Sequence, residues 1–203
     1  MAKLYLAALL AISAAPVQAQ PIALQPGPDS AEQRKGLQQL TACLAEARPR
    51  WARNTLSRPY LSDAQAYDAS RALSGKDSCA RDGTEVTFRT SGMVGSLAEH
   101  FLRKEMERVD SAGLADKLAT VRPLNVSEDF ALCVAARNPV AARELAMSEP
   151  GSSAEDAAAH QVAAQVEPCT HANEQLTVDL QALRSLVSTA LYRGVTALSV
   201  SDS

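Results

Sequence analysis

Four cysteines constrain the fold of this chain more than any other feature. Cys43 and Cys79 are 36 positions apart, and Cys133 and Cys169 are also 36 positions apart. Moving the first pair along the chain by 90 positions places it on the second pair. An even number of cysteines in an exported chain is typical of disulfides. We therefore expect Cys43 to pair with Cys79, and Cys133 to pair with Cys169.

The segments around the cysteines correspond at the same offset of 90 positions. Residues 41–103 align with residues 131–193 without a gap, and several identities besides the cysteines recur: Pro49/Pro139, Arg53/Arg143, Ser62/Ser152, Thr87/Thr177 and Arg103/Arg193. A solenoid is built from more copies of a shorter unit, so two copies of this length do not predict one. We expect a mainly α fold of two related helical modules, produced by tandem duplication and each holding one disulfide.

Capping patterns predict where several of the helices begin. A capping box joins an N-terminal Ser, Thr, Asn or Asp to a Glu or Gln three residues later. The pattern occurs at Ser30/Gln33, Ser62/Gln65, Asn125/Glu128 and Ser152/Glu155. We expect the first helix of each module at about residues 30–48 and 127–137, and the third at about residues 62–74 and 153–166.

Proline marks the start of the second helix in each module. Proline suits the first helical position and pushes the residue before it out of the helical conformation. Asn138 followed by Pro139 therefore predicts a cap and a new helix. Arg48 and Pro49 repeat this arrangement with a weaker capping residue.

The last helix of each module is expected at about residues 90–108 and 180–198, where apolar residues recur at helical spacing. The stretches just before them, "TEVTFR" and "EQLTVDL", alternate apolar and polar residues. This alternation favours one short extended segment per module, with helix as the alternative.

The N-terminal sequence predicts export. The first nineteen residues hold one lysine, an apolar run from Leu4 to about Ala15, and small residues at Val17 and Ala19, which is typical of a secretory signal peptide. Cleavage after Ala15 is the alternative. The apolar run is too short to span a bilayer, so we expect a periplasmic or secreted protein with no transmembrane segment. The expected organisation is signal peptide 1–19, extended arm 20–29, module 1 at 30–110, linker 111–124 and module 2 at 125–203.

Composition limits the partners. Removing residues 1–19 takes away one lysine and no acid, so the formal charge changes from −3 to −4. Nucleic-acid binding needs a net basic face, so we do not expect nucleic acid as a partner. Apolar residues make up 46% of the chain but aromatics only 4%, with alanine dominant. This composition favours helices that pack closely through small side chains.

No catalytic or cofactor motif stands out. His100, His160 and His171 lack a metal-ligand spacing, and the alternative of a metal site at Cys169 and His171 competes with the expected disulfide. The acidic pairs Glu128/Asp129 and Glu155/Asp156 fall in first helical turns, where the helix dipole favours negative charge. We predict no catalytic residue, no metal and no cofactor, and we do not expect an enzyme.

One stretch, "RPRWARNTLSR", suggests binding. It places four arginines around the single tryptophan: Arg48, Arg50, Trp51, Arg53 and Arg58. An arginine-rich face beside an exposed indole can hold an anionic component of the cell envelope or an acidic protein partner. The alternative is a solvated helix with a buried tryptophan. We expect a binding or structural role in the cell envelope; the competing hypothesis is an envelope hydrolase or small-ligand carrier with a site between the two modules.

Overall fold

The computed structural model describes residues 29–72, 79, 88–109, 111–170 and 178–196. Over these residues the protein is built from helices, with no β-strand, which confirms the mainly α fold. The elements are α1 (Ala31–Ala47), α2 (Pro49–Ser57), α3 (Asp63–Ala72), α4 (Thr90–Glu105), η1 (Met106–Arg108), α5 (Ser111–Thr120), α6 (Val126–Arg137), α7 (Pro139–Met147), α8 (Ser153–Ala163), η2 (Glu167–Cys169) and α9 (Leu180–Thr196). The predicted signal peptide and nearly all of the predicted arm lie outside the described residues.

Three of the four equivalent helix pairs begin at the same offset in the two halves, which we define as residues 31–105 and 126–196; α1 and α6 begin 95 residues apart. The starts of α2 and α7, of α3 and α8, and of α4 and α9 are each 90 residues apart. The capping residues predicted from the sequence are in place at Ser30, Ser62, Asn125 and Ser152, whose side-chain oxygens accept backbone N–H groups. Asn138 also caps α7, whereas Arg48 gives α2 no side-chain cap.

The segment expected as a linker, residues 111–124, contributes a helix to the core. It contains α5, whose Leu114 and Leu118 are buried against α6 and α9. The predicted extended segments fall mostly on residues 80–87 and 171–177, outside the described residues.

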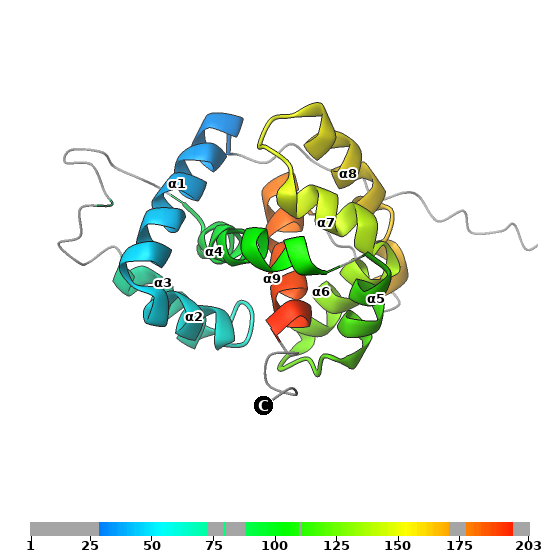
Figure 1. Ribbon diagram of the computed structural model, residues 1–203, viewed down its shortest axis with the longest axis horizontal. Coiled ribbons are helices and arrows are strands. Elements are labelled where there is room, and N and C mark those ends of the chain that lie inside the picture. The colour runs from blue at the N-terminus through cyan, green and yellow to red at the C-terminus, as the bar shows by residue number, and fades with distance from the viewer. Residues whose placement is uncertain (1–28, 73–78, 80–87, 110, 171–177, 197–203) are drawn as a thin grey trace, which may run out of the picture.

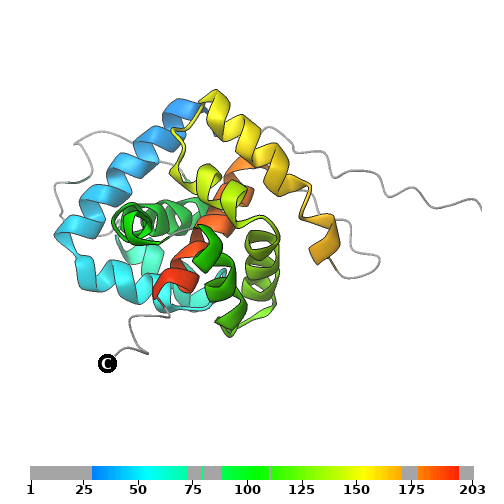
Figure 2. The same ribbon diagram turned by 45° about the vertical axis from the view of Figure 1, so that its right-hand side comes forward.

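The helices α4 and α9 form the centre of the molecule, with α1–α3 on one side and α5–α8 on the other (Figure 1). The view in Figure 2 shows the same central pair between α1 and α6. Gly95 of α4 allows the close approach, because a Cβ atom at this position would lie 2.5 Å from the Ser185 Cα of α9. Gly95 and Ser185 are equivalent positions of the two halves. Buried residues from both halves form one continuous hydrophobic core.

Each half is closed by its own disulfide, as predicted. Cys43 of α1 is bonded to Cys79, and Cys133 of α6 is bonded to Cys169 of η2, with Cα–Cα distances of 5.7 and 5.9 Å. Such bonds are typical of proteins outside the reducing cytosol. None of the helices in the described part of the chain is long and apolar enough to cross a bilayer.

Candidate functional site

The arginine-rich stretch predicted as a binding face is largely engaged with its own neighbours. The indole N–H of Trp51 donates to the Asp68 carbonyl oxygen at 2.9 Å, and the ring packs against the core. Arg58 pairs with the Asp68 carboxylate at 2.9 Å. Arg53 lies over the Phe101 ring, 5.3 Å from its centre.

The remaining two arginines of this stretch lie at the start of α2. Arg48 is half-buried at the junction of α1 and α2, and Arg50 is exposed in the first turn of α2. The structure therefore brings Trp51 and Arg58 together at Asp68, but it does not place an exposed indole among free cations.

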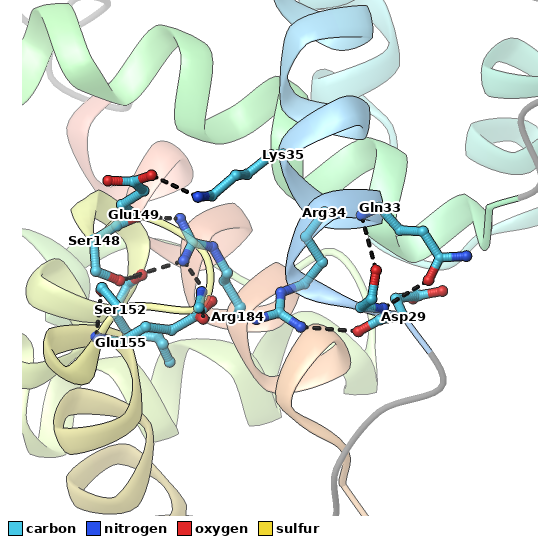
Figure 3. Close-up of polar contacts among 12 residues, drawn as sticks. Asp29, Gln33, Arg34, Lys35, Ser148, Glu149, Ser152, Glu155 and Arg184 are labelled. Carbon is cyan, nitrogen blue, oxygen red and sulfur yellow. Dashed lines mark hydrogen bonds and ion pairs between the residues drawn. The ribbon is translucent and has the colours of Figure 1, made fainter.

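A buried ionic cluster joins the two halves, with Arg184 of α9 at its centre. The Arg184 Nε donates to Glu99 Oε1 and its Nη1 donates to Glu155 Oε1, both at 2.7 Å. Its Nη2 also donates to the Ser148 carbonyl oxygen at 2.8 Å. The side chains of Arg184, Glu99 and Glu155 are only 2%, 4% and 0% exposed. Figure 3 shows Arg184 reaching toward Ser148 and Glu155.

A second arginine balances the charge of this cluster. The Arg34 Nη2 of α1 donates to Glu155 Oε2 at 2.7 Å, and the Gly151 backbone N–H donates to the same oxygen. Two carboxylates thus face two guanidinium groups. Removing one partner of a buried pair costs about 3–5 kcal/mol because the other charge is left uncompensated. The cluster serves to hold α1, α4, α8 and α9 together.

The charge on Arg184 is secured by its partners. Burial alone lowers the pKa of a guanidinium group, but the adjacent Glu99 and Glu155 carboxylates outweigh burial and hold the Arg184 pKa above its ordinary value. Both carboxylates of the cluster accept hydrogen bonds from guanidinium groups, whereas the buried Nε of Arg34 has no hydrogen-bond partner among the described residues.

An open groove of about 660 Å³ lies beside α6 and α9. Its lining includes Val126, Phe130 and Cys133 of α6, Ala182 and Leu186 of α9, and Val178, which lies just before α9. Ala182 and Leu186 are four residues apart, so they lie on one face of the helix. We call this feature the α6/α9 groove.

Residues from both halves close the groove. Tyr60 and Leu61, from the turn before α3, line it together with Pro168 and Cys169 of η2. Two of its apolar lining residues are strongly exposed: Val126 at 72% and Leu61 at 54%. Apolar groups left open to water in a concave surface are typical of binding sites.

Few polar groups interrupt these walls. They are the side chains of Ser91, Ser127, Thr170 and Asp129, together with the Tyr60 phenol. Burial raises the pKa of Tyr60 well above its ordinary value, so the phenol stays neutral. Among the described lining residues, Asp129 alone is charged, and there is no histidine to act as a general base.

The two described histidines, His100 and His160, lie in separate surroundings. The His100 ring meets Phe101 edge-on, and burial, followed by the charge of Lys104, lowers the His100 pKa. The His160 Nδ1 lies 2.7 Å from the Asp156 carbonyl oxygen, and His171 lies outside the described residues. In the described part of the chain, no three metal-ligating side chains gather at one point.

Sequence reasoning did not predict the α6/α9 groove, because its walls come from five separate parts of the chain. The signal that existed was Val126, an apolar side chain directly after the Asn125 cap, on the solvent side of the helix. Comparison of the chain with protein-family models, with curated proteins and with solved structures gave no match.

Proposed function

We propose that this is an exported, non-catalytic binding protein that holds a small molecule with an elongated apolar body in the α6/α9 groove. The main evidence for this proposal is the groove itself. Its size lies within the range of small-ligand sites, and its walls are apolar with a few polar groups. This choice favours the small-ligand carrier over the arginine-rich face as the binding element.

The lining supports an elongated ligand rather than a round one. Val126, Phe130 and Cys133 extend over seven positions of α6, or roughly 10 Å of helix length at 1.5 Å per residue, and Ala182 and Leu186 form a line along α9. An alkyl chain lying along this line contacts Phe130 on the opposite wall. Each buried methylene group contributes about 0.8 kcal/mol, which corresponds to about a fourfold gain in affinity.

Export and duplication belong to the same proposal. Two disulfides and the signal peptide predicted from the N-terminal sequence support a periplasmic or secreted location. The recurring 90-residue offset of helices and disulfides supports an origin by tandem duplication. A groove lined by residues of both halves is then a feature that a single copy lacks.

A homologous series of alcohols tests the proposal. Octanol, nonanol and decanol are titrated into the oxidised protein below their solubility limits, with calorimetry or displacement of N-phenyl-1-naphthylamine as the readout. We expect affinity to rise about fourfold with each methylene group. Ala182→Phe narrows the groove and should abolish binding. Ala157→Phe makes the same exchange on the exposed face of α8 and should leave binding intact.

Two outcomes of these measurements would overturn or replace the proposed function. Alcohols that bind neither variant nor parent, or bind all three equally, would overturn the proposal. Concentration-dependent dimerisation in sedimentation, lost in Ala182→Phe and unaffected by alcohols, would assign the groove to a second copy of the chain instead.

A further inference from the structure

We infer that the ligand of the α6/α9 groove carries a cationic group, such as an amine, at the end of its apolar body, and that Asp129 recognises it. The inference rests on the proposed function, because it concerns the chemistry of the same groove. Two observations support it: the charge of the groove lining, and the pairing of the cations nearby.

Asp129 supplies the negative charge. It is exposed in the first turn of α6, lines the groove, and forms no ion pair with any described residue. The N-terminal end of the α6 dipole contributes roughly half a positive charge, which offsets only part of a full carboxylate charge. The neighbouring Glu128 is buried and pairs with Arg193 at 3.4 Å, so this pair adds no net charge.

The arginine beside the start of α9, at the other end of the α9 wall from the Arg193–Glu128 pair, is also occupied. Arg89 precedes α4 and pairs with Asp179 at 2.7 Å and with Asp29 at 3.6 Å. Asp179 in turn adjoins Val178 of the groove. One guanidinium group thus faces two carboxylates, and these three side chains together carry a net negative charge.

These negative charges favour an amphiphile with a cationic head group over one with an anionic head group. A carboxylate or sulfate at the end of an apolar chain would meet Asp129 with no described lysine or arginine in the lining to neutralise it. An ammonium group gains a partner there while its chain stays on the apolar walls. The hydroxyl of Ser127, two residues before Asp129 on the same helix, offers an additional acceptor.

Three ligands of equal chain length separate charge from apolar contact: decylamine, decanol and decanoate, each at neutral pH and low ionic strength. We expect decylamine to bind about three- to fivefold more tightly than decanol, in keeping with a solvent-exposed ion pair, and decanoate to bind more weakly than decanol. Added salt should reduce the difference, because it screens exposed charges.

The variant Asp129→Asn should abolish the preference for decylamine while leaving decanol affinity unchanged. Asp116→Asn, an exposed position on α5 away from the groove, is the matched control and should keep the preference. Equal affinities for all three ligands, or a preference that survives Asp129→Asn, would overturn this inference and leave the proposed function standing. Failure of decanol itself to bind would overturn the proposed function.

Discussion

The turns before α3 and α8 share one backbone design. The residue at the turn has a positive φ in both cases: 60° at Leu61 and 81° at Gly151, its equivalent. The N–H of each donates to the side chain four residues later, to Gln65 Oε1 at 2.9 Å and to Glu155 Oε2 at 2.6 Å. The local frame is therefore the same in both halves.

The two side chains nevertheless complete their hydrogen bonding differently. The Gln65 amide N–H donates to the Thr55 carbonyl oxygen at 3.2 Å, so its contacts stay within the first half. The buried Glu155 carboxylate requires cations, which come from Arg34 of α1 and Arg184 of α9. The comparison teaches that a shared turn can serve a local contact in one half and a contact between halves in the other, because Glu155 is matched by arginines where the equivalent positions are Leu124 and Val94.

Replacing Glu155 by glutamine, the residue at the equivalent position 65, removes this difference between the two turns. Glu155→Gln removes the carboxylate that pairs with Arg34 and leaves Arg184 with Glu99 alone, so we expect a loss of about 3–5 kcal/mol in the free energy of unfolding. Urea unfolding followed by circular dichroism measures it. The control Asp156→Asn, on the exposed side of the same turn, should cost less than about 1 kcal/mol. Equal losses for both variants would contradict the account of the cluster.

Removing the disulfides one at a time compares the two halves directly. Both loops span 36 positions, so replacing either cysteine pair by serine should lower the free energy of unfolding by about 3–4 kcal/mol. Only the bond between Cys133 and Cys169 lines the groove, so only its loss should also weaken decanol binding in native conditions. Equal weakening by both double variants would argue against the groove as the site.

The crossing of α4 and α9 can be tested with two glycine substitutions. Gly95→Ala forces a Cβ onto Ser185, its equivalent in the other half, and should destabilise the protein by about 1–3 kcal/mol. Gly36→Ala, on the open face of α1 with nothing within 4 Å, should instead stabilise it by up to about 1 kcal/mol. The two thermal midpoints should therefore shift in opposite directions, and a shared direction would refute the close approach.

Local signals in the sequence were sufficient to predict much of the fold. Ser30 and Asn138 cap helices because their side chains are close in sequence to the amides they accept. Pro139 begins α7 because its ring fixes a helical backbone angle. The cysteine pairs followed from spacing alone.

Contacts over long distances in sequence were not predictable in this way. Glu155 was expected only to favour the helix dipole, yet it is buried and binds Arg34, 121 positions away. The α6/α9 groove likewise depends on how the turn at Tyr60 meets α6. Neither arrangement leaves a periodic pattern, because each is set by packing between elements rather than within them.

The central claim is that the α6/α9 groove binds an apolar chain, and an NMR titration of the isotopically labelled, oxidised protein with decanol tests it most directly. The account predicts saturable shifts at Phe130, Ala182 and Leu186, with the surroundings of Trp51 unchanged. Shifts confined to Trp51 and Arg50, or no saturable shift at all, would contradict it.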